Sequence, residues 1–236
     1  MQSKFVIPRS GMLNDYSKHL TFINAIAIAD NIYKKNEYYS NSIKNVMAVF
    51  VCNGFYESSD IFIGCISNLE PYYEMIDFLK FHFAMKAIES QLTNYEISIK
   101  NLISKYHDND NDIPVYYSDY GIICSMPKMY KEVKERVYFE EKLYTVRPYS
   151  KYVGEIKKRD NYKVELLSKR WISSRECWVI NVIHDETNFI TYFDSRDDIK
   201  DVNVGEFFKI RATIKRHQYS EYVKCNETQL TRVAYS

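Results

Sequence analysis

The stretch Val204-Gly205-Glu206-Phe207-Phe208-Lys209-Ile210-Arg211-Ala212-Thr213-Ile214-Lys215-Arg216-His217 decides the fold of the carboxy-terminal part of this 236-residue chain. Its apolar residues occupy one parity, and most of its cationic residues occupy the other. Successive side chains of a β-strand point to opposite faces, so this alternation predicts a strand with one buried face and one charged face. The expected inward residues are Phe208, Ile210, Ala212 and Ile214, and the expected outward residues are Lys209, Arg211, Thr213 and Lys215.

Four further segments have the β-branched and aromatic content of strands. Together with the quoted stretch they give five candidates: Tyr162 to Ile172, Cys177 to Asp185, Phe189 to Asp194, Phe207 to His217 and Tyr222 to Val233. The longest connection, around Arg196 to Val204, lies between the third and fourth candidates. Three strands, a longer connection and two more strands are the order of the OB-fold, a five-stranded Greek-key barrel. We therefore predict such a barrel over residues 146–236.

The part of the chain before this barrel has the apolar spacing of helices. That spacing recurs in residues 18–35, 72–90, 93–106 and 128–143. Residues 43–66 stay undecided between a buried helix and a strand. The residues Arg147-Pro148-Tyr149-Ser150 end the last helix and mark a domain boundary. The predicted fold class is α+β, with a mostly helical domain of unknown role over residues 1–145 followed by an OB-fold β-barrel.

Composition indicates an ordered protein outside the membrane. Hydrophobic residues make up 46% and charged residues 27% of the chain, which is typical of a folded globular protein. No apolar run approaches the roughly 20 residues of a membrane-spanning helix, and the first residues lack the pattern of a secretory signal. We expect a cytoplasmic protein with no membrane partner, in the host cytoplasm if the protein is viral.

The net charge of +1 conceals an asymmetry between the two parts of the chain. Residues 151–236 contain 16 Lys and Arg against 13 Asp and Glu, a net of +3, which leaves a net of −2 for residues 1–150. This excess is too small for the sequence-blind phosphate binding of a strongly basic domain. A nucleic-acid ligand would therefore depend on locally placed cations and on aromatic stacking.

Motifs for metal, nucleotide or covalent chemistry are absent from the sequence. The 5 histidines form no H-x-H or H-E-x-x-H pattern, the 5 cysteines form no C-x-x-C pair, and the 6 glycines form no phosphate-binding loop. Asp108, Asp110 and Asp112 imitate the start of an EF-hand loop, but Ile113 follows where that loop needs glycine. We expect structural thiols, no cofactor, no metal and no catalytic centre. The remaining enzyme alternative is a carboxylate cluster assembled from distant positions.

Four segments of the barrel region resemble the OB-fold module of phage-type single-stranded-DNA-binding and replication proteins. They are Trp178 to Asp185, Tyr192 to Ser195, Val204 to His217 and Thr228 to Val233, within the last third of the chain. The third segment matches the pattern G-(D/E)-x-(F/V)-x-(I/L)-x-(A/G)-T-(I/V)-K-(K/R)-H, and the fourth matches the ending T-x-L-x-R-(V/C). The resemblance implies an OB-fold that binds single-stranded DNA. The connection between the third and fourth strands carries Asp197, Asp198 and Asp201, whereas a cationic loop there would favour a phosphate ligand.

Single-stranded nucleic acids are bound by rings that stack on bases and by cations that follow the backbone. One ring of Tyr192 and Phe193 must lie outside by strand alternation, and we expect it to be the Tyr192 phenol. Trp178 could equally fill the core, and the cations could be a solvated strand face. The candidate nucleic-acid-binding residues are Trp178, Tyr192, Phe189, Arg175, Lys209, Arg211 and Lys215.

The leading hypothesis is a non-enzymatic protein that binds single-stranded DNA, or RNA, in phage-like DNA replication or recombination. Its barrel would hold the strand, and its helical part would organise the barrel or recruit replication proteins. The alternative is a protein-interaction or scaffolding module of a replication assembly, in which the helical domain binds the partner. Weak overall charge favours the alternative, and the barrel resemblance favours the leading hypothesis.

Overall fold

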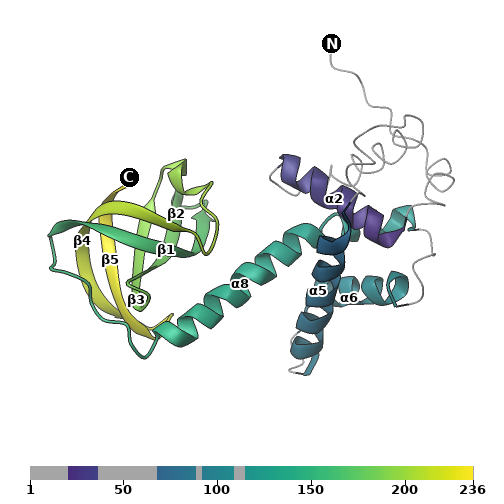
Figure 1. Ribbon diagram of the computed structural model, residues 1–236, viewed down its shortest axis with the longest axis horizontal. Coiled ribbons are helices and arrows are strands. Elements are labelled where there is room, and N and C mark those ends of the chain that lie inside the picture. The colour runs from purple at the N-terminus through teal and green to yellow at the C-terminus, as the bar shows by residue number, and fades with distance from the viewer. Residues whose placement is uncertain (1–20, 37–67, 89–91, 109–114, 236) are drawn as a thin grey trace, which may run out of the picture. The chain divides into compact units, whose positions relative to one another are not determined.

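The protein is described from a computed structural model, which covers residues 21–36, 68–88, 92–108 and 115–235. The chain divides into two compact units, Met1–Glu132 and Val133–Ser236. Helices precede a five-stranded sheet that closes on itself, so the expected α+β class is confirmed (Figure 1). The undecided segment 43–66 lies outside the described residues, and so do residues 109–114, which include Asp110 and Asp112 of the acidic segment.

The four segments with helical spacing are all helical where the structure describes them. The structure adds a short helical pair, η2 and α7, which the sequence did not predict because it spans too few residues for a period. The helices are α2 (Phe22–Asn36), α5 (Glu70–Ile88), α6 (Asn94–Tyr106), η2 (Tyr117–Asp119), α7 (Tyr120–Ile123) and α8 (Met126–Val146).

Helix α6 begins with a capping box that explains its sharp start. The Thr93 hydroxyl accepts the backbone N–H of Glu96 at 3.2 Å, and the Glu96 carboxylate accepts the backbone N–H of Thr93 at 2.9 Å. Burial alone would raise the pKa of Glu96, but the hydrogen bonds and charge of Lys86 and Thr93 outweigh it and lower that pKa to about 2. The carboxylate therefore stays ionised while it holds the helix start.

The strands follow the predicted order, and the second and third agree with the predicted bounds to within one residue. They are β1 (Arg159–Ile172), β2 (Cys177–His184), β3 (Asn188–Asp194), β4 (Phe207–Ser220) and β5 (Cys225–Tyr235). They close into a barrel in the order β1-β2-β3-β5-β4. Only the β3–β5 pairing is parallel among the described strands. The β1–β4 pairing completes the ring and places the decisive stretch beside the first strand.

The barrel interior is an apolar cluster to which every strand contributes. Ile210, Ala212 and Ile214 are at most 1% exposed, and Phe208 packs against the same cluster, so the predicted inward parity of β4 is confirmed. Ile199, from the short helix η3 (Asp197–Ile199) between β3 and β4, is fully buried in it. The barrel is therefore filled by side chains, and any ligand must bind its outside.

The second half of α8 belongs to the barrel unit. Phe139, Leu143 and Val146 are buried in a second apolar cluster with residues of β1, β2, β3 and β5. Beside this cluster the buried Glu165 of β1 accepts a hydrogen bond from the Tyr138 hydroxyl and pairs with the Lys142 ammonium at 2.8 Å. The boundary between the two units therefore falls within α8. The helix-breaking residues suggested a later boundary, between residues 145 and 146. The difference arises because the last turns of α8 are buried against strands of the barrel.

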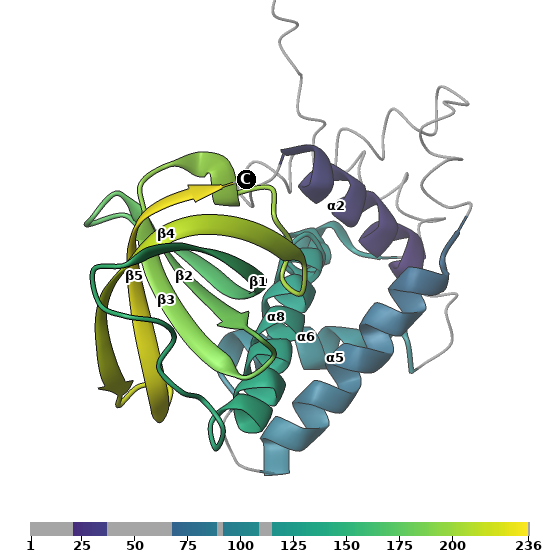
Figure 2. The ribbon, with the colours of Figure 1, turned by 60° about the vertical axis from the view of Figure 1, so that its left-hand side comes forward.

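The segment between α8 and β1 is fastened to the barrel along its length. The N–H of Val153 donates to the Thr228 hydroxyl at 2.9 Å, and the N–H of Lys157 donates to the carbonyl of Ile214 at 2.9 Å. Gly154 has a φ of +62°, and a Cβ there would lie 2.7 Å from the Ile214 side chain. Figure 2 shows this segment running along the barrel from the end of α8 to the start of β1.

Candidate nucleic-acid interface

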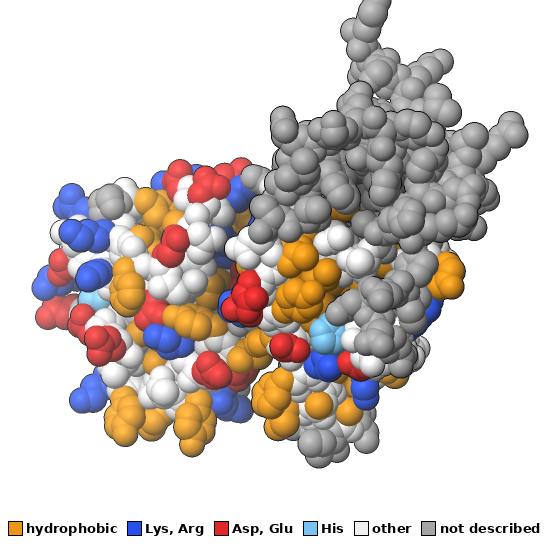
Figure 3. Space-filling view, turned by 45° about the vertical axis from the view of Figure 1, so that its right-hand side comes forward, with side chains coloured by type: hydrophobic (Ala, Val, Ile, Leu, Met, Phe, Trp, Pro, Cys, Tyr) orange, Lys and Arg blue, Asp and Glu red, His pale blue; other side chains and the backbone are white. Residues whose placement is uncertain are grey.

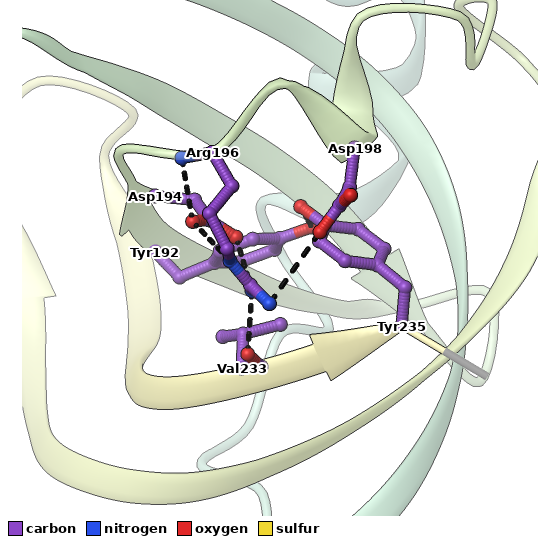
Figure 4. A network of polar contacts seen from close by, with 6 residues as sticks. All are labelled: Tyr192, Asp194, Arg196, Asp198, Val233 and Tyr235. Atoms are coloured by element: carbon purple, nitrogen blue, oxygen red, sulfur yellow. Dashed lines mark hydrogen bonds and ion pairs between the residues drawn. The ribbon is translucent and has the colours of Figure 1, made fainter.

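Two of the predicted stacking residues lie in the interior. Tyr192 is fully buried, and its hydroxyl lies 3.3 Å from the Tyr235 hydroxyl (Figure 4). Phe189 is 1% exposed and packs under α8. Neither ring offers a face to a base, so the predicted outward position of Tyr192 is wrong, and the candidate Phe189 is covered as well. Strand alternation did separate Tyr192 from Phe193, but the exposed ring is Phe193, at 41%.

A polar network explains why a phenol is tolerated inside the barrel. The guanidinium of Arg196 donates to both carboxylate oxygens of Asp194, at 3.0 and 2.7 Å, and to the carbonyl of Val233 at 2.6 Å (Figure 4). Burial and the nearby Asp194 carboxylate raise the pKa of Tyr235 to about 12, although the hydrogen bond with Tyr192 acts in the opposite direction. Burial also raises the pKa of Tyr192. Both phenols therefore stay neutral and pair with each other at this end of the barrel.

Trp178 is half-buried beside the more exposed Trp171. The two rings meet edge to face with centroids 5.4 Å apart, and the Trp178 indole N–H donates to Asp197 at 3.4 Å. Trp178 also packs against the barrel core. Arg175 is exposed in the turn between β1 and β2. This end of the barrel thus has rings and a cation, but the acidic connection after β3 lies against them.

The predicted cations Lys209 and Arg211 lie on a different part of the barrel, where β4 pairs with β1. Lys209 stands directly opposite Lys163, and Arg211 stands opposite Asn161. Arg159 is exposed at the start of β1, opposite Thr213. We call the outward side of these two strands the β1–β4 face, and its residues are Arg159, Asn161, Lys163, Phe207, Lys209 and Arg211.

The cations of the β1–β4 face pair with no acidic residue that the structure describes. Within the described parts of the chain, none of the four forms an ion pair with a carboxylate. The only carboxylate in line with them on β1, Glu165, is buried and already paired with α8. Side chains directly opposite in an antiparallel pair lie about 5 Å apart at their Cβ atoms, so like charges there repel. Asp160 is exposed between Arg159 and Asn161 but forms no ion pair with these cations, so four cations lie together on this face without an ion-pair partner among the described residues.

An exposed ring lies at the edge of the same face. Phe207 is 62% exposed, and the Lys163 ammonium lies 5.5 Å from the centre of its ring. Because the side chain of Phe207 is mostly exposed, its burial contributes little to the stability of the fold. The Lys163 ammonium lies over the ring, and the rest of the ring surface faces solvent. The β1–β4 face thus combines a ring with cations, which are the two groups that hold a single strand.

The predicted residues therefore fall into separate groups. Trp171, which stands opposite Trp178, lies eight residues along β1 from Lys163, or roughly 25 Å at the usual rise of a strand. Between them, Glu165 and Leu167 are covered by α8. Lys215 is exposed at a bulge between the pairs of Ile214 and Arg216 with β5. Only Lys209 and Arg211 of the seven candidates share the β1–β4 face.

Four residues of this face were not among the candidates, and for the two cations and the ring among them the sequence held a signal. Phe207 has the same parity as Lys209 and Arg211, so the quoted stretch already placed it outside. Lys163 alternates with the buried Tyr162 and Val164 in the first strand. Arg159 was not considered because the predicted first strand began at Tyr162, whereas β1 begins three residues earlier, at Arg159. A pairing between the first and fourth strands was needed to bring them together.

On the side of the barrel that faces the reader in Figure 3, Lys and Arg side chains lie among Asp and Glu side chains. Among the described residues, no group of three or more His, Cys, Asp and Glu is placed to hold a metal ion. None of the helices seen in the described segments is long and apolar enough to cross a membrane. Comparison of the chain with protein-family models, with curated proteins and with solved structures finds no match.

Proposed function

We propose that this chain is a non-enzymatic protein that binds single-stranded nucleic acid, with DNA as the expected ligand, on the β1–β4 face. One observation carries the proposal. Lys163 and Lys209 face each other directly across two paired strands, with Arg159 and Arg211 on the same side and no carboxylate partner among the described residues. A facing pair of like charges costs stability in the free protein. A bound phosphate backbone removes that cost.

The charge pattern also fits a single strand better than a duplex. Four cations on two short strand segments can neutralise only a few phosphates, whereas tight duplex binding usually takes more. The exposed Phe207 adds a surface on which an unpaired base can stack, worth about 1–3 kcal/mol per base. A duplex keeps its bases stacked inside and offers nothing to that ring.

The strand order supports an OB-fold, the fold that the sequence resemblance implies. The Greek-key order with a parallel β3–β5 pairing and a closing β1–β4 pairing agrees with such a barrel. Many OB-folds bind oligonucleotides on the face of strands 2 and 3. Here Ile183 and Phe189 of that face are covered by α8. The β1–β4 face is left open, which moves the proposed site to this side.

A role in phage-like DNA replication or recombination follows from the resemblance of the barrel sequence to such modules. The structure contributes a separate helical unit, which could link a bound strand to other replication proteins. The barrel would then hold DNA while the helices contact the partner.

A titration of the whole protein with fluorescein-labelled oligothymidine tests the proposal. We expect Lys163→Ser/Lys209→Ser to weaken binding about 10-fold or more at low salt and to flatten the dependence on salt, since each phosphate contact on a single strand contributes about −0.7 to the slope of log K against log salt. The matched control is Arg170→Ser/Arg175→Ser. It removes two exposed cations at the end of β1 and in the turn between β1 and β2, away from the β1–β4 face. Equal losses in both variants, or no binding by the unmodified protein, would contradict the proposed site.

A second candidate function is a protein-interaction module. Phe81 and Met85 lie four residues apart on α5 and are 68% and 51% exposed, so one side of this helix carries apolar groups in water. Co-purification of a partner that is lost with Phe81→Ser, while oligothymidine binding is absent, would favour this function over DNA binding.

A further inference from the structure

A second surface of the barrel unit lies where the segment after α8 begins. An open hollow of about 610 Å³ is lined there by residues of this segment, of the turn between β2 and β3, and of the start of β5. Its volume is within the range of small-ligand sites, roughly 300–1,000 Å³. The hollow is separate from the β1–β4 face, since none of the residues that line it belongs to that face.

The wall of the hollow is held in place by its own hydrogen bonds. The Ser150 hydroxyl donates to the carbonyl of Asn226 at 2.7 Å, and the Asn226 side-chain amide donates back to the carbonyl of Ser150 at 3.0 Å. The same Ser150 hydroxyl accepts the backbone N–H of Phe189 at 3.0 Å. These bonds tie the segment to β5 and β3, so the hollow exists before any ligand arrives.

The groups left for a ligand are donors, a cation and a ring. The side-chain oxygen Oδ1 of Asn188 accepts the backbone N–H of Lys151 at 3.0 Å. The side-chain NH₂ group of Asn188 donates to none of the described residues. The Lys151 ammonium is exposed and forms no ion pair within the described chain. Tyr149 is 66% exposed. This set suits an anion attached to a flat ring, as in a nucleotide.

Rings and cations continue from the hollow toward the β1–β4 face. Tyr152 stacks on His217 with centroids 4.8 Å apart and planes 7° apart, yet it remains 45% exposed. Lys157 and Lys158 are exposed just before Arg159, the first cation of the face. Figure 2 shows the segment that carries these residues on the outside of the barrel.

We infer that a single strand bound on the β1–β4 face continues along residues 149–158 and reaches the hollow, an inference that rests on the proposed function. There one nucleotide stacks its base on Tyr149 and places its phosphate near the Lys151 ammonium and the Asn188 NH₂ group. The hollow is thus an end subsite for a nucleotide of the same strand, and it sets the length of strand that the protein covers.

The test measures affinity against strand length with oligothymidines of about 4 to 16 nucleotides, the range of site sizes known for single OB-folds. The unmodified protein should bind more tightly with each added length until the hollow is filled. Tyr149→Ala/Lys151→Ala should bind the shortest oligomers with normal affinity. It should lack the last increase in affinity, about 5- to 20-fold, that the longest oligomers give the unmodified protein. Normal binding of short oligomers also shows that this variant is folded.

The matched control is Tyr144→Ala/Arg170→Ala, which removes an exposed tyrosine and an exposed cation away from the path. It should keep the full dependence on length. A Tyr149→Ala/Lys151→Ala variant with the same length dependence as the unmodified protein overturns the inference and leaves the proposed function standing. Failure of the unmodified protein to bind any oligothymidine overturns both.

Discussion

Single residues decide whether the β1–β4 face can hold bases as well as phosphates. Phe207 is the exposed ring on this face, with the Lys163 ammonium 5.5 Å away. We expect Phe207→Leu to weaken oligothymidine binding about 5- to 150-fold, since it removes one stacking surface of about 1–3 kcal/mol. Unfolding in urea should change little, because the side chain is not part of the core.

The control for this substitution is Phe193→Leu, at the other exposed phenylalanine of a barrel strand. It lies on β3, away from the proposed site, and should leave affinity unchanged in the same titration. The account of the ring is contradicted when Phe193→Leu weakens binding and Phe207→Leu does not.

The alternation of residues along a strand reveals some side-chain positions in advance but leaves others open. Alternation correctly assigned the inward side of β4, because a strand has a fixed period of two. The same rule required one of Tyr192 and Phe193 to lie inside, but it carries no information on which. Chemistry favoured the phenol outside, whereas the structure gives its hydroxyl a partner in Tyr235, far along the sequence. A long-range hydrogen bond of this kind leaves no local pattern.

At the scale of elements, α8 is part of the barrel unit rather than only its connector. Phe139, Leu143 and Val146 bury apolar side chains against the strands, each worth about 1.5–3 kcal/mol when fully buried. A fragment of residues 133–236 should therefore unfold cooperatively in urea. A fragment of residues 146–236, cut at the boundary that the sequence suggested, should expose that cluster and aggregate or unfold at lower urea, as followed by circular dichroism and light scattering.

Equal stability of the two fragments would show that α8 contributes nothing to the barrel. The sequence did not reveal this role because α8 ends normally before Pro148, and its apolar positions are compatible with packing on either side. The long-range pairing of β1 with β4 was hidden in the same way. Strand existence follows from local alternation, but the partner of a strand depends on residues far away in the chain.

At the scale of the molecule, the stability of the barrel unit should fall in alkali. Burial raises the pKa of Tyr138, Tyr192 and Tyr235, the last to about 12 from an ordinary value of 10.0, and the hydrogen bond to Glu165 raises the pKa of Lys142. Above pH 10 the unfolded chain loses protons that the folded chain keeps. The stabilisation is therefore complete below pH 10 and is lost as the pH rises toward 12 and beyond.

Urea unfolding between pH 8 and pH 11.5 measures this dependence as a fall in the free energy of unfolding. Tyr192→Phe keeps the ring and removes the hydroxyl, so it should flatten the curve above pH 10. A substitution at the exposed Tyr222, which is 83% exposed, serves as the control and should leave the slope as it is. A free energy of unfolding that stays constant up to pH 11.5 would contradict the buried, neutral state of these phenols.

The most direct measurement of the proposed function is a map of backbone amide shifts in the protein when an unlabelled oligothymidine of about 12 nucleotides is added. The largest shifts should fall on Arg159 to Lys163 of β1 and on Phe207 to Arg211 of β4, with smaller ones along residues 149–158. Shifts confined to the ends of β2 and β3 near Trp178 and Phe193, or the absence of any shift at low salt, would contradict a strand held on the β1–β4 face.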